Sequence, residues 1–253
     1  MTAPLTSCLA FDTATEHLSI ALQVGDAVWS RQGPGGAQAS ATLIPGIMDL
    51  LAQAGVGLRE LDAIAFGRGP GAFTGLRTAC AVAQGLAFGA DKPVLPIDTL
   101  LAVAEDARMD GAAEDVWVVM DARMDEIYAA HAVCEAGRWR YVTPPFLGTP
   151  QALNERWRSA PPRALAGSAL AAFGDRLACG DAQRLPNALP RARAMLPLAV
   201  ALWAQGGAVD AALALPLYLR DKVAQTMAER AAVKALAESA AAAVTAITGG
   251  VPT

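Results

Sequence analysis

A short pattern occurs twice in this chain of 253 residues and limits the folds open to it. Residues 9–14 read Leu-Ala-Phe-Asp-Thr-Ala, and residues 118–123 read Val-Val-Met-Asp-Ala-Arg. Each time an apolar run, which we expect to be a buried strand, ends in an aspartate and leads into a predicted β-hairpin. Helices and strands then alternate, so the sequence predicts two α/β lobes built on one plan, the second of them degenerate.

Hydrophobic periodicity places the elements of each lobe. In the first lobe, residues 1–109, we expect strands at 7–13, 17–24, 27–32, 62–67 and 93–96, and helices at 39–54, 75–89 and 99–109. In the second lobe, residues 110–222, we expect strands at 116–121, 126–134, 138–142 and 163–167, and helices at 149–158, 168–177 and 191–205. A polar linker at 110–115 joins the lobes, and an alanine-rich tail, residues 223–253, is expected to be largely helical.

The composition favours a protein with a large core and a covered surface. Hydrophobic residues make up 54% of the chain and charged residues only 17%, against an average of about 25% charged residues in soluble domains. The net charge of −4 and the absence of a basic run argue against a protein that holds a nucleic acid by itself. Four widely spaced cysteines, no signal peptide and no membrane segment indicate a cytoplasmic protein without disulfides.

Residues 67–77 read Gly-Arg-Gly-Pro-Gly-Ala-Phe-Thr-Gly-Leu-Arg and join a predicted strand to a predicted helix. Such a joint presents unpaired backbone N–H groups that could bind an anion. The loop lacks the Gly-Lys-Ser/Thr of a Walker loop and the glycine spacing of a dinucleotide fold. We therefore expect its glycines mainly to allow backbone conformations that side chains do not tolerate, and only secondarily to bind an anion. We expect Thr74 or Gly75 to be the N-cap of the helix.

The same loop resembles the Gly-Pro-Gly-Ser/Ala-Phe-Thr-Gly-Leu/Val-Arg hallmark of the TsaB (YeaZ) family. Residues 11–15, 120–124 and 216–220 resemble three further segments of that family, in the same order. The resemblance implies two ribonuclease-H-like lobes of the actin, Hsp70 and sugar-kinase (ASKHA) superfamily. It also implies a non-catalytic, activating subunit of the bacterial complex that makes N6-threonylcarbamoyladenosine (t6A) in tRNA.

Two interpretations are open for Asp12 and Asp121, which end the two repeated strands. In the superfamily, aspartates at these places face phosphate or a metal. Together with Thr13, Gly69 and Gly71 they would then form a cofactor site for ATP or ADP at a subunit junction, although the chain itself is expected to require no cofactor. The other interpretation, which we favour, is that each aspartate accepts backbone N–H bonds of its own turn.

The residues expected of an enzyme are scarce. The chain has two histidines, His17 and His131, and neither belongs to a metal-binding histidine pair. No Gly-x-Ser-x-Gly nucleophile elbow occurs. We therefore expect no catalytic residue, no metal and no turnover by the isolated chain. An ATPase or small-molecule kinase is the first alternative, and a metal-dependent peptidase is a disfavoured second one.

The helices expected at 39–54 and 75–89 are apolar over a wider arc than the stripe of roughly 100° that a helix on a sheet needs. Either the first helix is sunk between the sheet and a loop, or both helices meet a partner, which is our prediction. The predicted interface consists of Leu43, Ile47, Met48, Leu51, Leu76, Ala79, Cys80, Ala83 and Ala87. The resemblance implies that the partner is the catalytic TsaD homologue, with the TsaE ATPase in the same complex, a homodimer when the chain is alone, tRNA contact only through the complex and no membrane.

Overall fold

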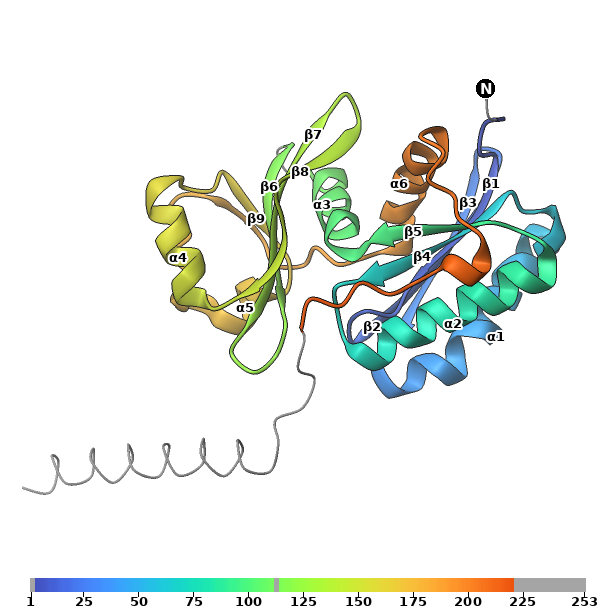
Figure 1. The fold of residues 1–253 in the computed structure, drawn as a ribbon, viewed down its shortest axis with the longest axis horizontal. Coiled ribbons are helices and arrows are strands. Elements are labelled where there is room, and N and C mark those ends of the chain that lie inside the picture. Colours follow the sequence, from blue (N-terminus) through green and yellow to red (C-terminus); the bar gives the residue numbers. More distant parts are fainter. Residues whose placement is uncertain (1–2, 112–113, 221–253) are drawn as a thin grey trace, which may run out of the picture. The chain divides into compact units, whose positions relative to one another are not determined.

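A mixed five-stranded sheet forms the centre of the first lobe in the structure, a computed structural model that describes residues 3–111 and 114–220. Its strands are β1 (Ser7–Asp12), β2 (His17–Val24), β3 (Ala27–Pro34), β4 (Ala63–Gly69) and β5 (Val94–Asp98), in the order β3-β2-β1-β4-β5 (Figure 1). Strand β1 pairs antiparallel with β2 and parallel with β4. All six residues of β1 are buried, as expected of a central strand with both faces covered.

Helices cover both faces of this sheet. Helices α1 (Ala39–Ala54) and α2 (Phe73–Ala90) pack on one face, where Leu9 and Phe11 of β1 belong to the same hydrophobic cluster as the inner side of each helix. Helix α6 (Ala192–Ala204) packs on the other face, against Cys8 and Ala10. Successive residues of β1 thus serve opposite faces, as the period of a strand requires.

The second sheet repeats the plan of the first. Its strands are β6 (Asp115–Asp121), β7 (Ile127–Glu135), β8 (Arg138–Gly148), β9 (Ala164–Ala166) and β10 (Gln183–Leu185), in the order β10-β9-β6-β7-β8. An antiparallel hairpin again lies on one side of the first strand and parallel strands lie on the other. Helices α4 (Pro150–Ser159) and α5 (Ala169–Phe173) contribute to the cluster on one face. The repeated sequence pattern therefore corresponds to two mixed β-sheets, each packed against helices.

Helix α3 (Thr99–Met109) packs against both sheets. Its Ala102 belongs to the cluster on the first sheet, whereas its Leu100 and Val103 belong to a cluster on the second. Helix α6 also contacts α3 and the first sheet. The predicted boundary at residue 110 assigned α6 to the second lobe, whereas α6 packs against the first sheet. Hydrophobic periodicity identifies a helix but does not say which sheet the helix covers.

Several predicted elements are corrected in detail. The N-cap of helix α2 is Ala72, not Thr74 or Gly75 as expected, and the helix begins at Phe73. The helix expected at 168–177 is α5 followed by a 3₁₀ turn, Gly174–Arg176, because Gly174 leaves the helical region with a φ of 51°. Strand β10 was not expected. The tail predicted for residues 223–253 lies outside the described residues.

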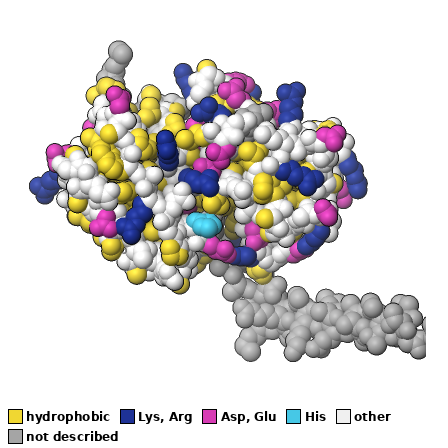
Figure 2. Space-filling model, turned by 180° about the vertical axis from the view of Figure 1, so that it is seen from behind, with side chains coloured by type: hydrophobic (Ala, Val, Ile, Leu, Met, Phe, Trp, Pro, Cys, Tyr) yellow, Lys and Arg dark blue, Asp and Glu magenta, His cyan; other side chains and the backbone are white. Residues whose placement is uncertain are grey.

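The charged side chains do not gather into a basic area on the face seen in Figure 2, where Lys and Arg lie among Asp and Glu. This mixture fits the net charge of −4. None of the helices in the described part of the chain is both long enough and apolar enough to cross a membrane.

Candidate functional site

Asp12 lies at the carboxyl end of β1 and has no exposed surface. Its Oδ1 accepts a hydrogen bond from the Ala14 N–H at 2.7 Å, and its Oδ2 accepts one from the Thr99 hydroxyl at 3.0 Å. The Thr99 oxygen in turn accepts the Gly69 N–H at 3.1 Å. Asp12 thus caps its own turn, as we favoured, and also ties β1 to the start of α3 and to the glycine loop.

Burial raises the pKa of Asp12 from its ordinary value of 3.8 to about 6, although the bonds from Ala14 and Thr99 oppose this rise. Desolvation dominates because the hydration free energy that an ionised carboxylate loses on burial exceeds the stabilisation from two hydrogen bonds. The folded protein therefore binds this proton more tightly than the unfolded chain does. The contribution of Asp12 to stability is complete below about pH 4 and is lost as the pH rises through about 6.

Asp12→Asn removes this titration and should change how stability depends on pH. Asparagine can still accept from the Ala14 N–H and can donate to the Thr99 oxygen. From pH 4 to pH 7 the variant should gain stability relative to the wild type by on the order of 3 kcal/mol. Urea unfolding of both proteins at pH 4, 5, 6 and 7 measures the difference. A difference that does not change with pH would contradict the raised pKa.

The glycine loop packs directly on the turn that Asp12 caps. A Cβ atom at Gly67 would lie 1.7 Å from Asp12 Oδ2, and one at Gly71 would lie 2.6 Å from both Cβ and the carbonyl oxygen of Ala14. Gly69 has a φ of 116°, which side chains rarely adopt. The glycines are therefore required for close packing, which supports the expectation that their main role is to allow this backbone conformation.

The residues predicted as a cofactor site come together as a packed joint, not as an open site. Asp12 and Thr13 have no exposed surface, and the Thr13 hydroxyl donates to the Gly75 carbonyl at 2.7 Å. A Cβ atom at Gly69 would lie 2.6 Å from the Leu217 carbonyl oxygen, and one at Gly71 would lie 2.6 Å from the Ala14 carbonyl oxygen. In this conformation neither side chain is exposed, so these four residues have a structural role here, and their cofactor role stays a prediction.

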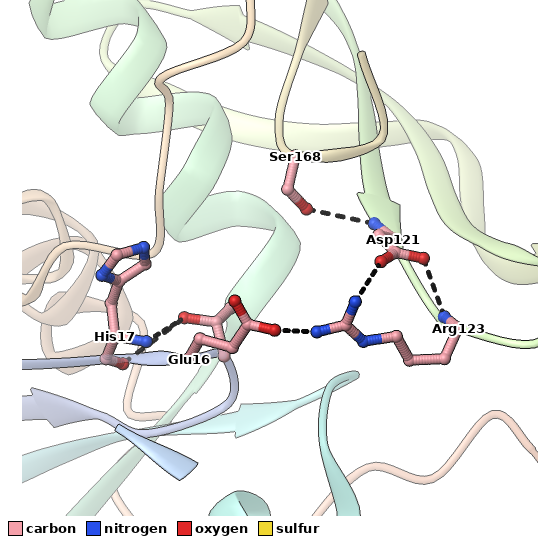
Figure 3. A network of polar contacts seen from close by, with 6 residues as sticks. Glu16, His17, Asp121, Arg123 and Ser168 are labelled. Atoms are coloured by element: carbon pink, nitrogen blue, oxygen red, sulfur yellow. Dashed lines mark hydrogen bonds and ion pairs between the residues drawn. The ribbon is translucent and has the colours of Figure 1, made fainter. Parts of the chain in front are cut away.

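Asp121 lies in a separate polar network, shown in Figure 3. Its backbone N–H donates to Ser168 Oγ at 3.1 Å, and its carboxylate accepts the Arg123 N–H at 2.8 Å and the Arg123 guanidinium at 3.1 Å. Arg123 also forms an ion pair with Glu16, so its side chain lies between the two carboxylates (Figure 3). Asp121 therefore caps its turn as Asp12 does, and Arg123 links the β1–β2 turn to the second sheet.

The histidines take no part in a catalytic arrangement that the described residues reveal. His17 is exposed, and its backbone N–H donates to the Thr15 hydroxyl at 3.1 Å. The His131 ring stacks on Trp117 with 5.0 Å between ring centres, and its Nε2 lies 2.7 Å from Asp115 Oδ1. Within residues 3–111 and 114–220, no group of three or more His, Cys, Asp or Glu is placed to hold a metal ion.

Most of the predicted partner interface does not lie on the surface of the chain. Eight of its nine residues are buried inside the chain itself, all but Cys80 with at most 2% of their surface exposed. These buried residues are Leu43, Ile47, Leu51, Leu76, Ala79, Cys80, Ala83 and Ala87. They pack on the first sheet and on the segment 205–219, which returns from α6 along α2: both Cys80 Sγ and Gln84 Nε2 donate to the Ala214 carbonyl.

A different side of the same two helices remains exposed. On α1, 45% of Ile44 and 48% of Met48 are exposed, and on α2 the exposed fraction of Phe88 is 85%. Ala81 and Gly85 of α2 are exposed as well. We call these five residues the outer helix face. Of the predicted interface, only Met48 belongs to it.

Proteins of known family resemble this chain over most of its length. The family model described as TsaD: tRNA N6-adenosine threonylcarbamoyltransferase matches residues 35–143. The tRNA threonylcarbamoyladenosine biosynthesis protein TsaB of Haemophilus influenzae is 39% identical over 228 residues, which cover 85% of this chain and 94% of that protein. TsaB of Escherichia coli is 34% identical over 223 residues, which cover 85% and 95% of the two chains. The solved structure of YeaZ from Pseudomonas aeruginosa is 38% identical and superimposes with a TM-score of 0.78 over 85% of this chain and all of that one. The chain therefore belongs to the TsaB (YeaZ) family of tRNA threonylcarbamoyladenosine biosynthesis proteins.

Proposed function

We propose that this protein is a non-catalytic subunit of the machinery that makes threonylcarbamoyladenosine in tRNA, and that it pairs with a catalytic TsaD-type homologue. The observation that carries the proposal is the 39% identity to a TsaB protein over nearly its whole length. The buried state of Asp12 and Thr13 supports a non-catalytic role, because a catalytic group must reach its substrate. The same burial disfavours the alternative of an ATPase or kinase.

The outer helix face is the surface that we propose for this pairing. Phe88 leaves 85% of its surface in water, although burying a phenylalanine side chain is worth about 1.5–3 kcal/mol. The chain also matches a TsaD-type family model, so the two partners are expected to be related in fold over that region. Related partners can pair about a pseudo-two-fold axis, and the same face would then pair with itself when the partner is absent. TsaE and tRNA would join through the complex, and the protein would work in the cytoplasm.

The isolated chain should show no turnover, and activity should require the partner. We expect purified chain, alone with tRNA and threonylcarbamoyl adenylate, to form no modified adenosine, and a mixture with the TsaD-type protein of the same organism to co-elute as one complex. Size-exclusion chromatography with light scattering checks the complex, and mass spectrometry of digested tRNA checks the product. Modified tRNA formed by the chain alone, or a TsaD-type protein that never co-elutes with it, would refute the proposal.

A further inference from the structure

Three side chains from two distant segments meet at the start of α2. The Arg77 guanidinium lies 3.9 Å from the ring centre of Phe73, one helical turn earlier. Arg77 Nε donates to the Tyr218 hydroxyl at 3.2 Å, and the rings of Phe73 and Tyr218 are 5.3 Å apart. We call Phe73, Arg77 and Tyr218 the Arg77 corner. Stacking and the hydrogen bond hold the guanidinium in one place, so little side-chain entropy remains to be lost on binding.

No carboxylate within residues 3–111 and 114–220 forms an ion pair with Arg77. No Asp or Glu occurs in residues 63–90 or 211–220, the two segments that build this surface. In the part of the chain that the structure describes, Arg77 forms no ion pair, and its terminal nitrogens donate no hydrogen bond. Seven other arginines do form ion pairs with acidic side chains: Arg31, Arg68, Arg108, Arg123, Arg140, Arg176 and Arg191.

The Arg77 corner continues the outer helix face along α2. Arg77, Ala81, Gly85 and Phe88 are exposed and follow one another at spacings of three or four residues, which places them on one side of the helix. Tyr218 adds an aromatic ring that is 43% exposed. Arginine and tyrosine next to an apolar strip have the composition of binding hot spots.

We propose that Arg77 is the specificity-determining residue of this face and that it binds a carboxylate of the protein partner. A guanidinium presents a fixed fork of donors that matches a carboxylate. A protein fits better than RNA, because the neighbouring exposed residues are apolar and a phosphate backbone needs several cations. This inference rests on the proposed function, whose partner is the TsaD-type homologue. It adds that the homologue must have a carboxylate where it contacts Arg77.

The test compares Arg77→Gln, Arg77→Lys and the matched control Arg158→Gln. Arg158 is exposed on α4 of the second lobe and forms no ion pair within the described residues. The dissociation constant for the TsaD-type protein is measured by calorimetry at two salt concentrations. Arg77→Gln should weaken binding by about 30-fold or more, as expected when one partner of an interfacial charge pair is removed. Arg77→Lys should recover part of this loss, and Arg158→Gln should bind like the wild type.

Each other outcome has a distinct meaning. If the wild type binds and Arg77→Gln binds equally well, the inference is overturned and the proposed function stands. If Arg77→Gln and Arg77→Lys lose binding and melting temperature together, Arg77 only holds Tyr218 in place, and the inference also fails. If the variants bind the partner normally but the complex loses tRNA, the ligand is a phosphate and not a carboxylate. If the wild type itself does not bind, the proposed function fails as well.

Discussion

Gly75→Ala should destabilise this protein strongly, whereas Gly85→Ala in the same helix should stabilise it slightly. A Cβ atom at Gly75 would lie 1.9 Å from the carbonyl oxygen of Thr13, which is backbone and cannot turn aside. A Cβ atom at Gly85 meets nothing within 4 Å. The Gly75 variant must displace α2 from the turn that Asp12 caps, and overpacking of this kind costs about 1–3 kcal/mol or more.

The Gly85 variant gains instead, because alanine is favoured over glycine in a helix interior by about 0.8–1 kcal/mol. Thermal and urea unfolding of both variants and the wild type measure the two effects. A change of 1 kcal/mol should shift the melting temperature of a chain of this size by about 2–4 °C. Opposite signs are expected. If Gly75→Ala melts at the wild-type temperature, the close approach of loop and turn is not what requires glycine there.

Ala83→Arg should prevent folding, whereas Ala81→Arg should fold and fail to associate. Ala83 has no exposed surface and belongs to the hydrophobic cluster between α2 and the first sheet. An arginine there buries an unpaired charge, at a cost of several kcal/mol, on the order of the whole stability of a domain. Ala81 is exposed on the outer helix face, so an arginine there remains in water until a partner approaches.

Circular dichroism and sedimentation of these two variants separate the core from the partner surface. We expect Ala83→Arg to lose its secondary structure or to be recovered only as aggregate. Ala81→Arg should keep the wild-type spectrum and sediment as a monomer with or without the TsaD-type protein. A folded Ala83→Arg protein would show that this side of α2 is not core. A folded Ala81→Arg protein that still binds its partner would remove the outer helix face from the interface.

Local patterns predicted most of the secondary structure. Helix α1 was expected at residues 39–54 and is found at Ala39–Ala54, because apolar residues at helical spacing identify a helix without knowledge of its neighbours. The hairpins after β1 and β6 follow from turn residues in the same way. Strand β10 was not predictable on this basis, since three residues, Gln183–Leu185, are too few to show a period.

The candidate site was predictable in part. The turn-capping interpretation of Asp12 and Asp121 depends on bonds to residues two positions away, Ala14 and Arg123, and the sequence contains both partners. Eight of the nine residues predicted for the partner interface are buried within the chain itself. A helix such as α2 that is apolar nearly all round must be covered on more than one face, but its sequence does not say which face the sheet takes.

The sequence by itself determined the family, the repeated strand–aspartate–hairpin plan and the need for glycine in the loop, because each is written in a short contiguous motif. Only the tertiary structure decided which surfaces are free. The segment 205–219 returns to cover a side of α2, which turns Ala83 inward and leaves Phe88 exposed. It also brings Tyr218 to Arg77 across 141 residues of chain. Such contacts depend on where two distant segments pack together, and the local sequence pattern of either segment does not predict that position.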